Sequence, residues 1–325
     1  MKSIVYIINS HFWKSITGPF FAFGFPIIFI AILGTMLGYD QVLGGILSIP
    51  TVTVSLTILP VALFEFKSSS LLKRIGVTSI KPWMFMLAIS SYYIVVMILG
   101  TIFTLLMAMI IFSGYFNEGR LIETVVVPNQ NGGTMNMDII APSFNEVLKH
   151  VNWGGFIWAN LMNIIVSTSL GLLISSLCKS TLSIQGISIP ILILSEFLAA
   201  QVLPIGMVKE INALYYLSYI TPFKYTSGLI VESWTGSMIV DYNSFVADAG
   251  KNAVVNMTYD STQNIFNINE SFYTFYKNFS SGTADINHGM LIFDKADKVA
   301  NLIMPFVFTG LFTGIALKRF KWSNR

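Results

Sequence analysis

The side chains that could do covalent or metal chemistry are few in this chain, and they lie far apart. Its three histidines are His11, His150 and His288, and its single cysteine is Cys178. The sequence contains no phosphate-binding loop of the GxxxxGK[ST] type, and no HExxH or GxSxG motif. We therefore expect no catalytic or metal site on this chain. Any energy that it uses must come from a gradient or from a partner.

Glu196 is a candidate of another kind, because it lies inside an apolar stretch. An acidic side chain there costs on the order of 3 kcal/mol unless it is paired or hydrated. Ser188, Ser195 and Pro190 share the stretch, so we expect a polar, kinked helix that faces protein or water. Two interpretations stay open. Glu196 and Ser188 line a pathway for a substrate or proton, or Glu196 forms a buried hydrogen bond with a neighbouring helix.

Hydroxyl side chains also mark an earlier apolar stretch, which runs between Pro50 and Pro60. Thr53 and Thr57 lie one helical turn apart within it. Threonine hydroxyls can donate to the carbonyl groups of their own helix, which makes them inexpensive in lipid. The alternative is that Thr53 and Thr57 face a transport pathway.

A polar interval at 64–83 separates two long apolar runs and predicts a short amphipathic helix. Its apolar side would carry Leu71, Leu72 and Ile75, and its basic side Lys73 and Arg74. The flanking residues agree, because serines at 68–70 can cap its start and Gly76 can end it. Pro82 suits the first turn of the following helix. The alternative is a basic loop between two membrane spans.

The composition determines the class of protein. Apolar residues make up 54% of the chain and charged residues only 11%, which is outside the range of soluble domains. About 18 apolar residues can cross a bilayer, and six stretches are long enough. They cover roughly 18–38, 44–64, 83–112, 154–178, 183–203 and 299–317. We therefore predict an all-α polytopic membrane protein that forms one transmembrane domain.

The charges between these spans predict the orientation, because Lys and Arg are retained on the cytoplasmic side. Eleven basic residues and Glu65 fall on one side, and eight basic and fourteen acidic residues fall on the other. Both termini and the 64–83 interval are therefore expected in the cytoplasm, with the spans in the plasma (inner) membrane. The basic balance reports this topology and gives no reason to infer a nucleic-acid partner.

Other segments predict contacts at the membrane surface and between spans. Residues 2–17 place apolar side chains four apart and predict an interfacial helix; alternatively, they extend the first span. Two GxxxG pairs predict close helix packing, within one chain or across a dimer. They are Gly34 with Gly38 and Gly310 with Gly314. Outside, 113–153 is a polar loop, 204–236 predicts short re-entrant helices rich in tyrosine, and 237–298 predicts a small lobe.

Taken together, this arrangement resembles the permease subunits of ABC exporters of the type-2 class, the ABC-2 membrane family. Four features carry the resemblance, and together they cover nearly the whole chain. They are the interfacial segment at 2–17; the stretch with Glu65, Lys67, Leu71, Leu72, Arg74 and Gly76 that leads to Lys81 and Trp83; SYITPFKY at 218–225; and FKW at 320–322. The lobe at 237–298 is longer than the usual external segment of that family, which leaves the substrate open.

The resemblance implies a coupling helix between spans two and three that docks on a nucleotide-binding subunit. The residues implied in coupling are Glu65, Lys67, Leu71, Leu72, Lys73, Arg74, Ile75 and Gly76. It also implies a homodimer or heterodimer of permeases, with ATP and Mg bound by a separate ATPase subunit. An apolar, weakly polar pathway favours a lipid, hydrophobic drug or amphipathic peptide as the exported substrate.

Two other classes of function compete with this one. A channel or gradient-driven carrier would also suit Glu196 and the hydroxyl-rich second span. Against a carrier, the chain has no evident inverted repeat and only one intramembrane acid for ion coupling. A membrane-anchored binding or immunity protein, acting through the external lobe, would leave the basic stretch at 64–83 unexplained.

Overall fold

The protein is mostly helical, and six of its helical segments are long and apolar enough to cross a membrane. This computed structural model describes residues 2–68, 82–119, 121–128, 134–140, 143–199, 201–203, 208, 211–234, 257–260, 265–268 and 295–319. The six spans are Thr17–Met36, Val42–Ser68, Met84–Ile111, Trp153–Leu177, Thr181–Leu198 and Ala296–Arg319. The prediction of six helices long and apolar enough to cross a membrane is therefore confirmed.

The spans are built from elements of different regularity. The first consists of α2 (Thr17–Pro19), the π-helical turn η1 (Phe20–Gly24) and α3 (Phe25–Met36). The second follows α4 (Tyr39–Ile46) and consists of α5 (Ile49–Thr53), the π-helical turn η2 (Val54–Ile58) and α6 (Leu59–Ser68). The remaining spans are α8 (Pro82–Ile111), α10 (Trp153–Leu177), α11 (Thr181–Leu198) and α16 (Lys295–Arg319). The start of α8 confirms Pro82 as a first-turn residue.

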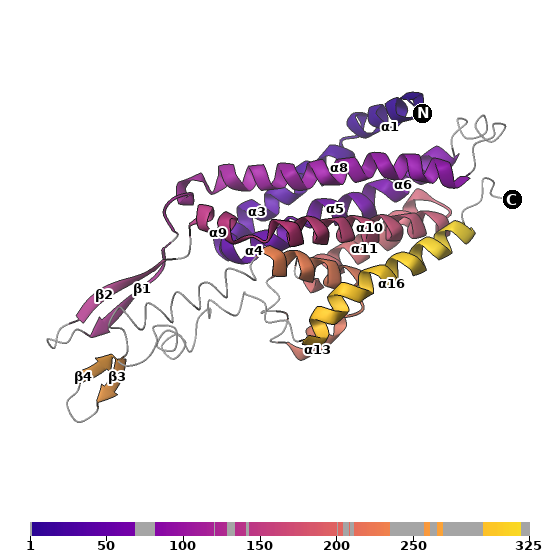
Figure 1. Ribbon diagram of the computed structural model, residues 1–325. Helices are drawn as coiled ribbons and strands as arrows, with labels where there is room; N and C mark the ends of the chain where they lie inside the picture. Colours follow the sequence, from indigo (N-terminus) through magenta and orange to yellow (C-terminus); the bar gives the residue numbers. More distant parts are fainter. Residues whose placement is uncertain are drawn as a thin grey trace.

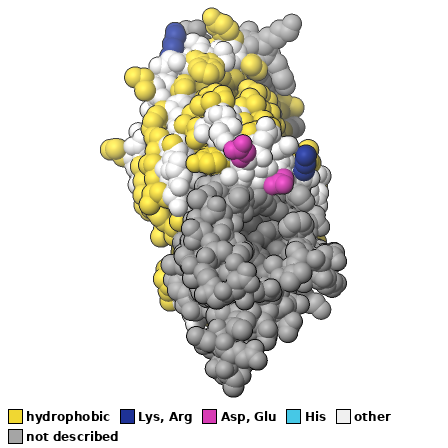
Figure 2. Space-filling view, turned by 90° about the vertical axis from the view of Figure 1, so that its left-hand side faces the viewer, with side chains coloured by type: hydrophobic (Ala, Val, Ile, Leu, Met, Phe, Trp, Pro, Cys, Tyr) yellow, Lys and Arg dark blue, Asp and Glu magenta, His cyan; other side chains and the backbone are white. Residues whose placement is uncertain are grey.

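The spans run side by side along one bundle (Figure 1). The helix α1 (Lys2–Lys14) and the end of α16 at Arg319 lie at the same end of this bundle. The opposite end carries two short antiparallel hairpins, formed by β1 (Leu121–Pro128) with β2 (Thr134–Ile140) and by β3 (Met257–Asp260) with β4 (Ile265–Ile268). Figure 2 looks onto that end and shows hydrophobic side chains along the described flank, with few charges among them.

The second span is the centre of the bundle. In the most apolar 18-residue stretch of this span, 89% of the stretch is buried, whereas the corresponding share in the last span is 17%. Its side chains take part in three apolar clusters, which pack it against the first, third, fourth and fifth spans. A helix that is apolar all round belongs in such a central position. The other spans therefore pack around the second span.

A proline follows each of the two π-helical turns. The two residues are Pro26 after η1 and Pro60 after η2. In a π-helical turn a carbonyl accepts from the N–H five residues later, and proline has no N–H. The carbonyl groups of Phe21 and Ser55 therefore lack a backbone donor from their own turn. A buried carbonyl in a membrane span must find another partner.

A neighbouring helix approaches each of these carbonyl groups. The hydroxyl of Thr53 lies 2.9 Å from the Phe21 oxygen and can donate to it. The Ser55 oxygen is packed against Gly171 of α10, where an added Cβ atom would overlap it. A glycine Cα–H can make a weak contact with such an oxygen. These two contacts join the first, second and fourth spans at the centre of the membrane-spanning region.

A structured segment follows the fifth span. It contains α13 (Asn212–Ser218) and a further helix at 222–234, whose residues 222–228 are all buried. Helices were predicted between 204 and 236, and the described residues there confirm two of them.

The segment at 113–153, which was predicted as a polar loop, contains regular elements. They are η3 (Ser113–Tyr115), the β1–β2 hairpin and α9 (Phe144–His150). Residues 129–133, between β1 and β2, and most of the predicted 237–298 lobe lie outside the described residues.

The contact between α10 and η2 can be tested with glycine substitutions. Gly171→Ala should lower the free energy of unfolding by about 1–3 kcal/mol, because its methyl group would meet the fixed Ser55 carbonyl. Gly186→Ala on α11 is the matched control, since nothing lies within 4 Å of an added Cβ atom there. Thermal unfolding in detergent measures both. Equal melting temperatures for the two variants would contradict the close approach.

Candidate functional site

The predicted coupling stretch is only partly visible. Leu71, Leu72, Lys73, Arg74, Ile75 and Gly76 lie outside the described residues, so their role stays a prediction. Glu65 and Lys67 are described, and they belong to the last two turns of α6. The helix α6 continues past 64, the approximate end of the predicted second span, and includes the buried side chain of Phe66.

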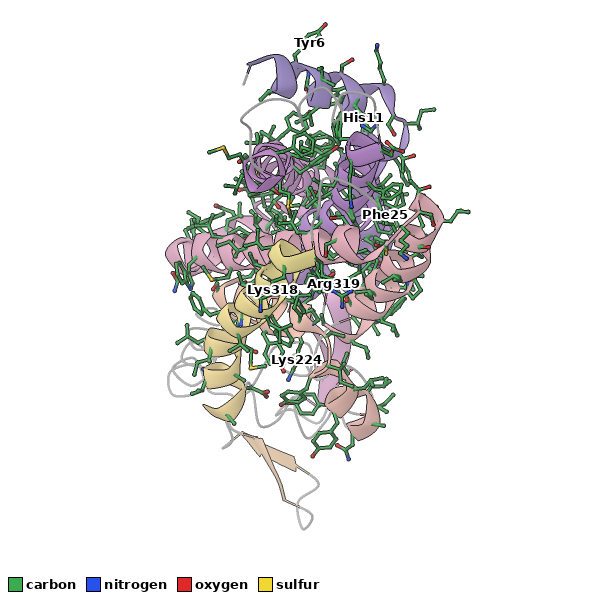
Figure 3. The ribbon with its side chains drawn as sticks, turned by 90° about the vertical axis from the view of Figure 1, so that its right-hand side faces the viewer. Tyr6, His11, Phe25, Lys224, Lys318 and Arg319 are labelled. Carbon is green, nitrogen blue, oxygen red and sulfur yellow. The ribbon has the colours of Figure 1, made fainter. Side chains whose placement is uncertain are left out.

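A side-chain hydrogen bond connects α1 to this end of α6. His11 Nε2 lies 2.8 Å from Glu65 Oε2, and the His11 ring also packs on Phe66 with centroids 5.3 Å apart. In Figure 3, His11 points toward the bundle and Tyr6 points away from it. Sequence analysis did not find this pair, since 54 residues separate the partners and no spacing rule relates them.

The helix α1 is a separate amphipathic element beside the spans. Its Ile8 and Phe12 side chains are each 1% exposed, and Phe12 packs on the rings of Tyr92 and Tyr93 of α8. The Tyr92 hydroxyl donates to Asn9 Oδ1 at 2.9 Å. The opposite face leaves Tyr6 exposed. The alternative in which these residues simply extend the first span is wrong, because α1 ends at Lys14 and α2 begins at Thr17.

The predicted pathway residues fall into two groups. The Thr53 and Thr57 hydroxyls both contact backbone carbonyls, Thr53 those of Phe21 and Ile49, and Thr57 that of Thr53 at 2.6 Å. This is the arrangement in which threonine is inexpensive in lipid. The structure therefore explains both hydroxyls by the helix backbone.

Ser188 and Glu196 differ from the threonines. Both are buried on α11, with 1% and 3% of their surface exposed. Neither Ser188 Oγ nor Glu196 Oε1 has a hydrogen-bond partner among the described residues. Ser188 belongs to the stripe of α11 that includes Ile184 and Leu192, whose apolar cluster also contains residues of the second span. An unpaired buried polar atom is costly, which marks both positions as candidates for function.

The four predicted packing glycines lie in different surroundings. Gly34 leaves room for the ring of Phe112, which an added Cβ atom would overlap, and Gly38 has a φ of 98° at the turn before α4. Gly34 thus serves packing inside the chain, whereas Gly38 permits the backbone conformation of a turn. Gly310 and Gly314 on α16 have nothing within 4 Å of an added Cβ atom among the described residues.

A buried charge cluster connects the last span to the helices after the fifth span. Asp297, in the first turn of α16, accepts hydrogen bonds from the hydroxyls of Tyr215 and Tyr219. Lys224 Nζ donates to Asp297 Oδ1 at 3.1 Å. Lys224 and Asp297 are 0% and 2% exposed, so this is a fully buried ion pair (Figure 3 labels Lys224).

The tyrosines complete the surroundings of the lysine. Lys224 Nζ lies 2.9 Å from the ring centroid of Tyr219 and 4.8 Å from that of Tyr215, which permits cation–π attraction. Burial, and then the hydrogen bond to Asp297, raise the pKa of Tyr219 to about 12. Burial also raises the pKa of Tyr215. Both hydroxyls therefore stay protonated at neutral pH and can donate to the carboxylate.

The buried helix at 222–234 makes further polar contacts. The Thr226 hydroxyl donates to Asn163 Oδ1 of α10 at 2.8 Å, and Gln201 Nε2 donates to Ser227 Oγ at 3.2 Å. Near its end, the Asn152 backbone N–H donates to the Ser233 carbonyl at 2.9 Å. The helix is thus held to α10, α16 and the end of the fifth span by polar groups. Sequence analysis predicted short helices rich in tyrosine in this segment but missed this network.

In the described part of the chain, no group of three or more His, Cys, Asp and Glu could hold a metal ion. Cys178 is buried, and burial raises the pKa of its thiol, which makes the thiol a poor nucleophile. No family model matches the chain, and no curated sequence or solved structure is detectably similar to it. Its function must therefore be argued from its own residues.

Removal of Asp297 should be strongly destabilising. Asp297→Asn would leave the Lys224 charge buried without its carboxylate, which should cost about 3–5 kcal/mol of unfolding free energy. Lys298→Gln is the matched control, because the adjacent Lys298 pairs with Glu232 at 3.0 Å on an exposed surface. That change should cost no more than about 1 kcal/mol. Thermal unfolding of the two variants in detergent tests this, and similar small losses would argue against a buried pair.

Proposed function

We propose that this chain is the membrane-spanning subunit of an ATP-driven exporter of the type-2 ABC class. It moves a hydrophobic or amphipathic substrate out of the cell, and a separate ATPase subunit binds ATP and Mg. The observation that carries the proposal is the hydrogen bond between His11 and Glu65, which fixes α1 to α6 directly before the basic stretch at 69–81. A partner that docks on this stretch would therefore bind next to a helix end, that of α6, which α1 holds in position.

The mechanism follows from how this end of the bundle is built. A short helix outside the bilayer can transmit the rigid-body movement of an ATPase to the spans that it joins. Those spans are α6, which belongs to the central second span, and α8, on which α1 packs. Leu71, Leu72 and Ile75 would fill a groove on the partner, and Lys73 and Arg74 would meet acidic groups. Movement there would reach the bundle centre directly.

The outer end is suited to respond to such a movement. The buried pair of Lys224 and Asp297 joins the helix at 222–234 to the last span, and Gln201 joins it to the end of the fifth. The fifth span also carries Glu196, whose Oε1 atom has no partner among the described residues. In this proposal Glu196 and Ser188 contact the substrate during transport. The two chains of a dimer would place their pathways side by side in the plasma membrane, with both termini in the cytoplasm.

A channel or gradient-driven carrier is the second candidate function. Glu196 favours it, because a buried carboxylate with an unpaired oxygen could bind a proton or cation. A channel or carrier would not need a basic stretch beside α1 on which a partner can dock. The two candidates therefore differ in whether a change at 73–74 affects activity.

Charge reversal tests the coupling function. Lys73→Glu combined with Arg74→Glu should leave the complex in the membrane but reduce ATP-driven transport at least tenfold, since like charges then face the partner. Lys179→Glu, in the other cytoplasmic loop, is the control and should retain transport. Transport and ATP hydrolysis are measured in vesicles at matched protein levels. Full transport by the double variant would exclude this coupling function and favour the carrier.

Glu196→Gln separates a functional from a structural carboxylate. Glutamine keeps the shape and hydrogen-bonding capacity but removes the charge, so transport or its specificity should change several-fold while the protein amount stays normal. Thr57→Val is the control, because the Thr57 hydroxyl only contacts its own helix. The readouts are transport per molecule and the yield of purified protein. A loss of yield with unchanged transport per molecule would show that Glu196 is structural.

A further inference from the structure

Four buried amide side chains lie where the helix at 222–234 packs against α10, α16 and the end of the fifth span. They are Asn160 and Asn163 of α10, Asn301 of α16, and Gln201, and none is more than 9% exposed. We call these four residues the amide cluster. Every polar atom at such a depth in a membrane protein needs a hydrogen bond, because its burial is otherwise costly.

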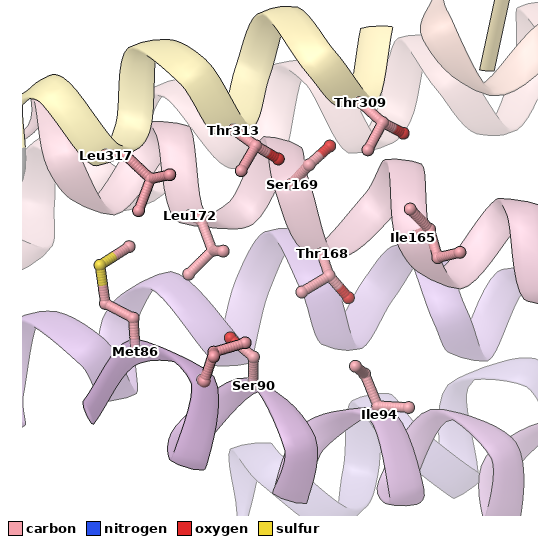
Figure 4. A pocket seen from close by; sticks show the side chains of 11 residues that line it. Met86, Ser90, Ile94, Ile165, Thr168, Ser169, Leu172, Thr309, Thr313 and Leu317 are labelled. Atoms are coloured by element: carbon pink, nitrogen blue, oxygen red, sulfur yellow. The ribbon is translucent and has the colours of Figure 1, made fainter. Parts of the chain in front are cut away.

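The helices α10 and α16 follow one another through the bundle. Nearer to α1 they line a groove of about 670 Å³ together with α8, and Thr313 of α16 lies there beside Ser169 of α10 (Figure 4). Farther from α1, Trp158 of α10 packs on Phe306 of α16 with ring centroids 6.5 Å apart. Asn301, which is fully buried, precedes Phe306 by little more than one turn. It therefore lies in the part of the bundle where α10 carries its two asparagines.

Two members of the amide cluster use only one end of their amide group. Asn163 Oδ1 accepts from the Thr226 hydroxyl at 2.8 Å, and Gln201 Nε2 donates to Ser227 Oγ at 3.2 Å. Their other atoms, Asn163 Nδ2 and Gln201 Oε1, have no hydrogen-bond partner among the described residues. The helix at 222–234 thus satisfies each of these amides by half.

The other two amides are satisfied even less. Asn160 Nδ2 donates to the Phe156 carbonyl at 2.9 Å, but Asn160 Oδ1 has no partner in the described part of the chain. Neither amide atom of Asn301 has one. Turning the Asn301 amide around would not help, because both of its ends lack a partner. Asn301 lies one turn after Asp297, which pairs with Lys224 of the helix at 222–234.

The five unpaired atoms of the amide cluster are of both hydrogen-bonding kinds. Two are donors, Asn163 Nδ2 and Asn301 Nδ2, and three are acceptors, the side-chain oxygens of Asn160, Gln201 and Asn301. A cation would serve only the oxygens, and an anion would serve only the N–H groups. Water both donates and accepts, and a buried water makes about three hydrogen bonds to otherwise unsatisfied groups. The mixture of donors and acceptors therefore fits water.

We propose that the amide cluster binds internal water molecules, which bridge the amide of Asn301 to the amides of α10. The free Gln201 oxygen accepts from water in the same way. The helix at 222–234 is then held to α16 by the ion pair of Lys224 and Asp297, and the contact of α16 with α10 is completed by water. This site does not depend on the proposed transport function, because the amides need partners whatever the chain transports.

An experimental structure of the full chain in nanodiscs tests the site, at a resolution at which ordered water is visible. We expect a density peak at about 2.7–3.2 Å from an Asn301 amide atom and from a free amide atom of Asn160 or Asn163. The same structure of Asn301→Leu should lack this peak. A direct hydrogen bond between Asn301 and another side chain, or close packing without a water peak, would overturn the proposal.

Melting temperatures in detergent give a second test. Leucine is close to asparagine in size but has no polar atoms, so Asn301→Leu would remove two hydrogen bonds of the bound water. The melting temperature should fall by about 2–4 °C. If the Asn301 amide has no water, its removal would relieve a buried unpaired group, and an equal or higher melting temperature would overturn the proposal.

Asn212→Leu is the matched control, because Asn212 is exposed at the start of α13. The same chemical change should shift the melting temperature there by less than about 1 °C. The search for a water peak uses the unchanged chain. It therefore decides the proposal even if Asn301→Leu does not fold.

Discussion

Every buried backbone carbonyl of a membrane span needs a partner, and this constraint organises the centre of the protein. Pro26 and Pro60 remove the N–H groups that would serve Phe21 and Ser55 in the two π-helical turns. The Thr53 hydroxyl and the backbone of Gly171 take those places. Three spans are thereby brought into contact by polar groups, in a region where apolar packing alone does not distinguish protein from lipid.

Hydrogen-bonded side-chain pairs connect elements at the two ends of the bundle. At the end with α1, the exposed pair of His11 and Glu65 positions α1 against α6. At the other end, the buried pair of Lys224 and Asp297 attaches the helix at 222–234 to the last span. The exposed pair is worth little stability and is readily exchanged for other contacts, whereas the buried pair cannot be broken cheaply. A movement that begins at α1 would therefore reach the outer helices without separating them from α16.

Much of the architecture could be predicted from the sequence, because apolar runs and proline positions report local properties. The six spans, the helix α1 and the start of α8 at Pro82 follow from such patterns. The back-bonding of the Thr53 and Thr57 hydroxyls was also one of the two predicted alternatives. The contacts between distant residues could not be predicted in the same way.

The missed contacts have specific physical reasons. Asp297 falls just before the predicted sixth span at 299–317, so it counted as an external acid, although the helix begins at Lys295 and buries it. Lys224 was read as one charge in an aromatic segment, since only the folded chain places it beside Asp297, 73 residues away. The His11 and Glu65 pair was hidden for the same reason. The π-helical turns were not predicted, since neither apolar runs nor proline positions specify the hydrogen-bonding pattern of a helical turn.

The central claim is that this chain works with a separate ATPase subunit. The most direct measurement is to purify the full chain from its native membrane in a mild detergent and to determine the composition and ATPase activity of the complex. The account predicts a second subunit with a GxxxxGK[ST] motif in fixed stoichiometry, and ATP hydrolysis that changes when the permease is removed. Transport of substrate by the purified chain alone, in vesicles without nucleotide, would contradict it.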